Sequence, residues 1–342
     1  EDTTMSKVRA WAAQAAGQKL ERYDYTPGLL GDDEVDIAVE YCGLCHSDLS
    51  MIDNAWKFSA YPLVPGHEAV GRIVAMGSRA KGLSIGQRVG VGWTSSSCLH
   101  CAPCVGGDQH LCGASQATLS GRPGGFAERV RAQWAWAIPV PEGIRPEVAG
   151  PLFCGGITVF SPLVEYDISP TSRVGVVGIG GLGHLAIKFA KAWGCEVTAF
   201  TSSPSKRKEL LAQGAHRVVA SNDANAIAAL AGSLDLVIVT VNVPLDWQAI
   251  TSTLAPRGRL HFVGAVLDPI PVQAFSLISG QKVISGSAIG SPTQMARMLA
   301  FCVRHNIEPE VEHFPMSRVN EALDHLRAGK ARYRIVLDAD FD

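Results

Sequence analysis

Two patterns of hydrophobic and polar positions divide the chain near residue 147. Before that point, short segments alternate hydrophobic and polar residues, or run through β-branched residues, between glycine-rich turns. No helical period is sustained there, so we predict strands over 34–41, 69–76, 88–92 and 126–131. A β-rich domain therefore comes first.

From about Val148 onward, strand-like and helix-like segments alternate. The predicted strands are 173–177, 196–200, 236–240 and 260–263, and the predicted helices are 182–193, 206–213 and 245–254. This alternation is typical of βαβ crossovers in a doubly wound parallel sheet, here over 148–290. After about residue 291 we expect two amphipathic helices, 293–305 and 319–328, and a last strand, 334–338. The fold class expected is α/β.

Composition narrows the kind of protein. A length of 342 residues favours two domains, and 47% hydrophobic against 18% charged residues allows a sizeable core. A net charge of -2 without a long basic block argues against nucleic-acid binding. No uninterrupted apolar segment reaches the ~20 residues needed to span a bilayer, and the first residues do not resemble a secretory signal. We expect a cytoplasmic protein.

A glycine loop lies between the strand 173–177 and the following helix. Gly178, Gly180 and Gly183 stand in G-x-G-x-x-G register, with Gly181 and Leu182 between them. This pattern allows a tight turn, close approach of a pyrophosphate and close packing of helix on strand. A glycine-rich turn without a ligand is the simpler interpretation, but the βαβ context favours a dinucleotide.

The end of the second strand bears on which dinucleotide is bound. An NAD site would carry an acidic residue there, whereas this strand ends in Thr201-Ser202-Ser203. Small hydroxyls leave room for a 2′-phosphate, and Lys206 and Arg207 can supply positive charge. Although the basic residues could simply form a solvated helix turn, we predict NADP(H).

Nine cysteines are present, and four of them lie within fifteen residues: Cys98, Cys101, Cys104 and Cys112. Two-residue spacers let one turn direct successive thiolates at a single zinc ion. Four protein ligands leave no open coordination position, so we predict a structural zinc. The alternatives are free thiols or disulfides, and a reducing compartment disfavours the disulfides.

Three further motifs are ambiguous when taken singly. They are Cys42-Gly43-Leu44-Cys45-His46-Ser47-Asp48, Gly66-His67-Glu68-Ala69-Val70-Gly71, and the segment 149–158 containing Phe153-Cys154. Together with the cysteine cluster and the glycine loop, their order and spacing resemble the zinc-containing medium-chain alcohol dehydrogenases. The cinnamyl alcohol dehydrogenase-like branch, which includes bacterial NADPH-dependent aldehyde reductases, is the most similar. The resemblance implies a GroES-like domain over 1–147 and 291–342 around a Rossmann domain over 148–290.

The resemblance also implies roles at the active site. Cys45, His67 and Cys154 would hold a catalytic zinc, and Glu68 would transiently take its fourth position. Three protein ligands leave a Lewis-acid position open for substrate. Asp48 would orient the histidine, and Ser47 would exchange a proton with the bound alcohol.

At Ser50 the sequence departs from many relatives, which have a histidine there that extends the proton relay. Serine has no pKa near neutrality, so we expect the proton to leave through water instead.

Further residues are assigned by the same resemblance. Trp56, Trp93 and Phe153 would line the substrate pocket, although a core position is the alternative for the tryptophans. Ile289 would lie beside the nicotinamide, Arg334 would reach the pyrophosphate, and Thr158 would contact the cofactor.

We therefore expect reversible hydride transfer between NADP(H) and an apolar or aromatic primary alcohol or aldehyde, mainly as aldehyde reductase with two zinc ions per chain. One alternative is an NAD-linked alcohol, polyol or formaldehyde dehydrogenase. Another is a catalytically silent dinucleotide-binding sensor. The partners expected are a small molecule and copies of the same chain, as a homodimer or homotetramer that meets at the edge strand 283–289.

Overall fold

The chain forms two compact units in the computed structural model, which describes residues 7–341. One unit comprises Glu1–Ile157 and Gly290–Asp342, and the other comprises Thr158–Ile289. Residues 1–6 and 342 of the predicted first domain lie outside the described residues. Each unit is described by itself below.

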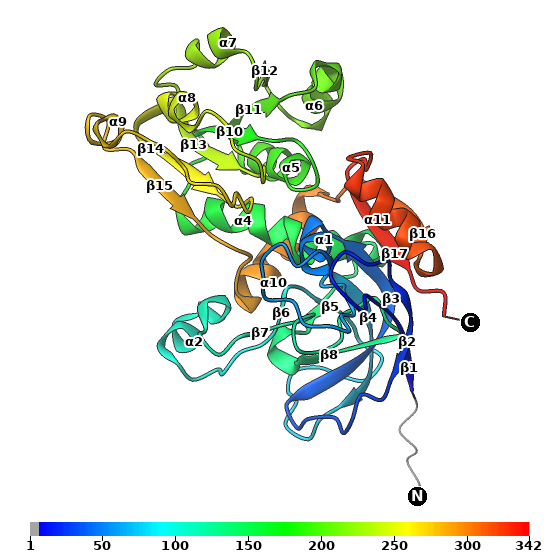
Figure 1. The fold of residues 1–342 in the computed structure, drawn as a ribbon. Coiled ribbons are helices and arrows are strands. Elements are labelled where there is room, and N and C mark those ends of the chain that lie inside the picture. Colours follow the sequence, from blue (N-terminus) through cyan, green and yellow to red (C-terminus); the bar gives the residue numbers. More distant parts are fainter. Residues whose placement is uncertain (1–6, 342) are drawn as a thin grey trace, which may run out of the picture. The chain divides into compact units, whose positions relative to one another are not determined.

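The first unit is built on a mostly antiparallel sheet around one long strand, β3 (Glu34–Leu44) (Figure 1). It pairs with β4 (Ala69–Met76), β8 (Arg129–Gln133) and β17 (Arg334–Asp338). The sheet order is β16-β17-β3-β4-β5-β9, with β8 beside β3. The last strand of the chain therefore completes a sheet that the first third began.

Most of the remaining elements of this unit are short, and α10 is the long exception. The strands are β1 (Val8–Ala12), β2 (Glu21–Tyr25), β5 (Arg88–Val91), β6 (Thr94–Ser96), β7 (Gln116–Ala117), β9 (Ile138–Pro139) and β16 (Val311–Pro315). The helices are α1 (His46–Ile52), α2 (Ala102–Gly106), α3 (Pro146–Ala149), α10 (Pro292–His305) and α11 (Val319–Arg327), and short 3-10 turns include η1 (Gln109–Leu111), η3 (Gly150–Phe153) and η5 (Met316–Arg318). Buried aliphatic residues such as Val35, Ile37 and Ile73 of β3 and β4 form the core, together with Ile335 of β17.

The second unit contains a six-stranded parallel sheet in the order β12-β11-β10-β13-β14-β15. Its strands are β10 (Arg173–Val177), β11 (Glu196–Thr201), β12 (Arg217–Ala220), β13 (Leu234–Val239), β14 (Leu254–Phe262) and β15 (Val283–Gly286). Its helices are α5 (Gly183–Trp193), α6 (Arg207–Gln213), α7 (Ala224–Ala228), α8 (Trp247–Ser252) and α9 (Ala274–Ile278), and α4 (Gly155–Glu165) spans the unit boundary. The prediction of a doubly wound parallel sheet is confirmed.

Most predicted elements are present with small differences at their ends. The helix predicted over 245–254 begins at Trp247, because the Asp246 side chain caps it by accepting from the Ala249 amide. The strand predicted to start at Leu260 already begins at Leu254, and a strand predicted from Phe126 begins at Arg129. Among the described residues, no single helix is long and apolar enough to cross a bilayer. Only the bent pair 146–153 and 155–165 passes that test, by length and composition when taken together.

Candidate active site and metal centres

Two cysteine sulfurs and one histidine nitrogen lie close together in the first unit, although the three residues are far apart in sequence. Cys45 is the N-cap of α1 directly after β3, His67 precedes β4, and Cys154 follows η3. The Sγ atoms of Cys45 and Cys154 lie 4.0 Å apart, and His67 Nε2 lies 3.3 Å from Cys154 Sγ. The tertiary structure therefore brings together the three residues predicted to hold the catalytic metal.

The spacing of these atoms fits a tetrahedral zinc ion. Zn–S bonds of about 2.3 Å and Zn–N bonds of about 2.0 Å place two sulfurs about 3.8 Å apart, and a sulfur and a nitrogen about 3.5 Å apart. The distances observed agree with those values within the usual tolerance of a few tenths of an ångström. Three side chains of this kind leave a fourth coordination position for another ligand.

Asp48 holds the histidine of this cluster in place. Its Oδ1 atom lies 2.9 Å from His67 Nδ1 and accepts from the Gly66 amide, and its Oδ2 accepts from the Cys45 amide at 2.9 Å. Asp48 and His67 are both fully buried. Nδ1 faces the carboxylate and Nε2 faces the Cys154 thiol. The tautomer protonated on Nδ1 would therefore present the Nε2 lone pair that a metal ligand requires.

Glu68 and Arg334 form a buried ion pair beside the cluster. Arg334 Nη2 donates to Glu68 Oε1, and Arg334 Nη1 lies 3.9 Å from Cys45 Sγ. The second oxygen, Glu68 Oε2, is buried without a hydrogen-bond partner and belongs to the same cluster of candidate ligands. Arg334 was predicted to reach the pyrophosphate. Its contacts here are instead with the candidate metal cluster, because β17 pairs with β3 and carries Arg334 to Cys45.

The electrostatics of the cluster follow from its burial and its charges. Burial raises the pKa of Glu68 to about 7, against the opposing charge of Arg334. The neighbouring Cys154 thiol, together with Arg334, holds the pKa of Cys45 well below its ordinary value. Burial alone would lower the pKa of His67, but the Asp48 carboxylate and Cys45 together outweigh burial and raise that pKa well above its ordinary value. The site therefore favours a thiolate at Cys45, the form that binds metals.

The predicted proton donor lies beside the metal ligands. Ser47 Oγ is 3.8 Å from Cys45 Sγ, on the first turn of α1, and the side chain is half-buried. Ser50 lies on the same helix one turn later and is also half-buried.

Two of the three predicted pocket residues lie near the ligand cluster. The Trp93 ring meets His67 edge-on with centroids 5.1 Å apart, and Trp56 meets Trp93 at 5.7 Å. Phe153 differs from the prediction. It is fully buried, and its ring occupies the space that a Cβ at Gly90 would need. Packing against β5 makes Phe153 a core residue and not an open wall of the pocket.

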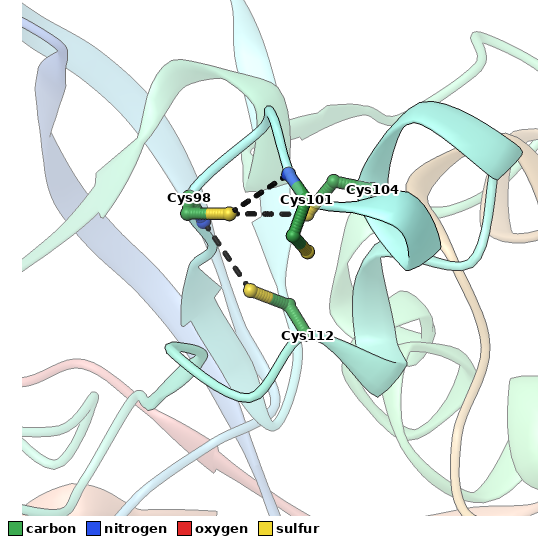
Figure 2. Close-up of side chains that lie close together, drawn as sticks. All are labelled: Cys98, Cys101, Cys104 and Cys112. Carbon is green, nitrogen blue, oxygen red and sulfur yellow. Dashed lines mark hydrogen bonds between the residues drawn. The ribbon is translucent and has the colours of Figure 1, made fainter.

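The four clustered cysteines converge on one point, as Figure 2 shows. They lie on the loop around α2 and η1, with Cys98 Sγ 3.9 Å from Cys104 Sγ. The backbone amides of His100 and Cys101 lower the pKa of Cys98 to about 6. Four convergent sulfurs with amide donors fit a tetrahedral zinc site without an open position.

The glycine loop of the second unit combines two crowded glycine positions with an open one. Gly178 has φ +89° and a Cβ there would meet Val241, while a Cβ at Gly183 would lie 2.0 Å from the Gly178 carbonyl. At Gly180 a Cβ would meet nothing within 4 Å, so space is open where a ligand would approach the backbone. Gly181 and Leu182 complete the turn before α5.

Lys206 is the basic residue that the fold brings to this loop. Its Nζ donates to the Ile179 carbonyl at 3.0 Å, whereas Arg207 Nη1 donates to the Val218 carbonyl on β12. At the end of β11, Thr201 is buried and accepts from the Ser203 amide, while Ser202 is exposed. Of the two basic residues predicted to bind the 2′-phosphate, Lys206 therefore contacts the glycine loop. Arg207 contacts β12 instead.

Two other predicted cofactor residues belong to the second unit. Thr158 is buried on the first turn of α4. Ile289 follows β15 and adopts a positive φ of +34°. Their predicted contacts with the cofactor stay predictions.

Sequence reasoning missed Thr240, which follows β13. Its hydroxyl lies within hydrogen-bond distance of the carbonyl oxygens of Val177 and Gly178, so it anchors the first residue of the glycine loop. Its position at the carboxyl end of the strand next to β10 was the only available signal, because such ends meet at one edge of a parallel sheet.

Comparisons with known proteins agree with this architecture. Residues 31–142 match the family described as Alcohol dehydrogenase GroES-like domain, and residues 181–304 match the family Zinc-binding dehydrogenase. The chain is 52% identical to the aldehyde reductase AdhA of Synechocystis over 96% of this chain and 98% of the relative. It is 39% identical to the probable cinnamyl alcohol dehydrogenase 8A of Oryza sativa over 96% of this chain and 94% of that relative.

Solved structures give the same result. A cinnamyl alcohol dehydrogenase from Sorghum bicolor superposes with a TM-score of 0.95 at 36% identity, covering 98% of this chain and 99% of that chain. The CAD of Helicobacter pylori, complexed with NADP(H), superposes with a TM-score of 0.89 at 29% identity. The match covers 97% of this chain and 98% of that chain. The chain is therefore an oxidoreductase of the zinc-binding medium-chain alcohol dehydrogenase family, with a GroES-like and a Rossmann domain, and belongs to its cinnamyl alcohol dehydrogenase-like branch.

Proposed function

We propose that this protein is an NADP(H)-preferring aldehyde reductase that interconverts apolar or aromatic primary aldehydes and alcohols and binds two zinc ions per chain. The observation that carries the proposal is the cluster of Cys45, His67 and Cys154 with Ser47 beside it. When bound, zinc supplies Lewis acidity at the substrate oxygen, and the reduced dinucleotide supplies a hydride.

The residues of the chain contribute orientation, charge and a proton. In the direction of reduction the carbonyl carbon would gain a hydride, and its oxygen would take a proton from the Ser47 hydroxyl. Ser47 would regain that proton from water, so that aldehyde, NADPH and one proton give the primary alcohol and NADP+. Asp48 keeps His67 in the tautomer whose Nε2 can bind metal. Arg334 offsets the negative charge of Glu68 and of the Cys45 thiolate. Trp93 and Trp56 supply an apolar aromatic surface next to His67, which favours apolar substrates over sugars.

The preference for NADP(H) rests on the end of β11. Thr201 stands where an acidic residue would bind the ribose hydroxyls of NAD, and Lys206 lies at the glycine loop. The relative from Helicobacter pylori was solved with NADP(H). NADPH is usually held reduced in cells, so reduction would be the physiological direction.

The test is initial-rate reduction of acetaldehyde, hexanal, benzaldehyde and cinnamaldehyde with NADPH and with NADH, on protein whose zinc has been counted. We expect NADPH to be preferred and the bulky aldehydes to give the higher kcat/KM. Preference for NADH would favour the NAD-linked alternative. One zinc per chain without turnover of any aldehyde would favour the catalytically silent sensor.

A substitution at the end of β11 sharpens this test. Thr201→Asp places a carboxylate where a 2′-phosphate would lie, so we expect the NADPH to NADH ratio of kcat/KM to fall by about 100-fold. The control is Ser205→Asp, which changes an exposed residue four positions further along the chain. It should alter the NADPH to NADH ratio far less. An unchanged ratio in Thr201→Asp would contradict the assignment of this segment.

The proposal includes a homo-oligomer and a cytoplasmic location, the latter because clustered thiols persist in a reducing compartment. The edge strand β15 and the neighbouring α9 expose large apolar side chains: Phe275, Ile278 and Val283. Such a surface fits a second copy of the chain. Sedimentation analysis of Ile278→Asp and of wild type would test this interface. We expect the variant to sediment as a smaller species. An oligomer of unchanged size in the variant would contradict an interface at β15 and α9.

A further inference from the structure

Ile289 has a backbone conformation that is unfavourable for its side chain. Its φ of +34° lies in the left-handed region, which β-branched residues rarely adopt. Such a conformation persists only where the surrounding structure holds it, and it is common at ligand sites. The contacts that hold Ile289 therefore bear on what this segment does.

One side chain holds the backbone of Ile289 directly. Ser161, on the second turn of α4 and 5% exposed, donates its hydroxyl to the Ile289 carbonyl at 3.0 Å. Both residues belong to the second unit.

A second set of contacts fixes the residues just before Ile289. The fully buried His261 of β14 has Nδ1 2.9 Å from Ser285 Oγ and Nε2 2.8 Å from Ser287 Oγ. The Ser287 amide also donates to the Phe262 carbonyl. The segment from β15 to Ile289 is thus anchored at both of its ends, so that its shape is set before any ligand arrives.

The position of the segment from β15 to Ile289 in the sheet indicates which part of a bound dinucleotide it would contact. Ile289 follows the carboxyl end of β15, and the glycine loop follows the carboxyl end of β10, on the same edge of the parallel sheet. Three strand spacings separate them, or about 14 Å. Lys206 and the end of β11 lie on the other side of β10. A dinucleotide with its pyrophosphate at the glycine loop and its adenosine beside β11 extends its other half toward Ile289.

We propose that Ser161 is a positioning residue that holds the Ile289 backbone in its left-handed conformation and so preforms the part of the second unit that receives the nicotinamide end of the cofactor. The inference rests on the proposed function, because it needs a nicotinamide dinucleotide. Ser161 itself acts through Ile289 and does not touch the ligand.

The test compares Ser161→Ala with wild type in the full-length, zinc-loaded protein. Binding of NADPH is measured beside binding of ADP-ribose 2′-phosphate, which has the adenosine and pyrophosphate but lacks the nicotinamide. We expect the variant to bind NADPH roughly three- to ten-fold more weakly, with the affinity for ADP-ribose 2′-phosphate unchanged. The value of kcat should fall in the same variant, because the hydride donor is held less well.

The matched control is Ser233→Ala, which removes a serine hydroxyl that donates to the Leu230 carbonyl at the opposite, amino end of β13. It should leave the affinity for both ligands unchanged. A second comparison uses Ile289→Gly, because glycine adopts positive φ without penalty. In that background Ser161→Ala should weaken NADPH binding less than it does in wild type.

The outcomes distinguish a failure of the role given to Ser161 from a failure of the proposed function. Equal NADPH binding by Ser161→Ala and wild type, or equal weakening of both ligands, would overturn the role of Ser161 and leave the proposed function intact. A wild-type protein that binds neither NADPH nor NADH would overturn the proposed function and this inference with it.

Discussion

Gly43 illustrates how a single residue in a motif is determined by contacts that the sequence does not reveal. A Cβ at this position would lie 1.9 Å from Glu68 Oε2 and 2.9 Å from Glu68 Cβ. The Gly43 amide also donates to the Glu68 carbonyl. The glycine between Cys42 and Leu44 is therefore required by the acid beside the candidate catalytic metal, and not by a turn.

We expect Gly43→Ala to lower both activity and stability. The added methyl group forces Glu68 away from Arg334, which should cost about 1–3 kcal/mol and lower kcat/KM by roughly ten-fold or more. Unfolding in urea and initial rates would measure the two effects. Gly106→Ala is the control, since a Cβ there meets nothing within 4 Å. Wild-type values for Gly43→Ala would show that this contact has no consequence.

The proton path gives a second prediction at this scale. Ser50→His places an imidazole on α1, one turn after Ser47. We expect alcohol oxidation near neutral pH to rise by up to about ten-fold, because imidazole exchanges protons there. Rates with a primary alcohol and NADP+ across a pH series would measure this. Equal rates for the two proteins at every pH would contradict the prediction.

At the scale of elements, the spacing of residues in the sequence predicted a motif correctly wherever one turn or loop contains the whole motif. The four cysteines lie within 98–112 and converge as predicted, and the glycine loop joins a strand to a helix as predicted. Element ends were less predictable, since capping by Asp246 and pairing of β14 with its neighbours set them.

The cysteine loop allows a test of its metal. In Cys112→Ser we expect zinc to fall from two ions to one per chain, and the midpoint of thermal unfolding to fall by roughly 5–10 °C, since a loop ordered by metal loses its crosslink. Metal analysis and calorimetry would measure both. The control is Cys302→Ala, a buried thiol outside both clusters, which should keep two zincs. Two zincs in Cys112→Ser would disprove the assignment.

At the scale of the whole molecule, a buried histidine makes stability depend on pH. Burial, reinforced by the charge of Arg259, lowers the pKa of His261 to about 4. The Tyr166 ring packs against the imidazole, and two serine hydroxyls bond to it. The folded state therefore disfavours the protonated imidazole, which the unfolded chain accepts freely below about pH 6.5.

The stability that neutral His261 contributes is fully present above about pH 6.5 and is lost as the pH falls to about 4. The difference between these pKa values corresponds to about 3 kcal/mol at most. We expect wild type to lose up to that much more unfolding free energy than His261→Gln over this interval, measured by urea unfolding at several pH values. Parallel profiles for the two proteins would contradict this assignment.

The sequence by itself determined the features that depend on neighbours in the chain. These are the β-rich start, the βαβ alternation, the glycine loop and the four-cysteine loop. The resemblance added the separated ligands Cys45, His67 and Cys154. What these residues touch was decided only by the tertiary structure. Pairing of β17 with β3 carried Arg334 to Glu68, packing on Gly90 made Phe153 a core residue, and α4 brought Ser161 to Ile289. The physical reason is that periodicity and spacing report contacts within a few residues, whereas partners tens to hundreds of residues apart are chosen by sheet pairing and close packing of the whole core.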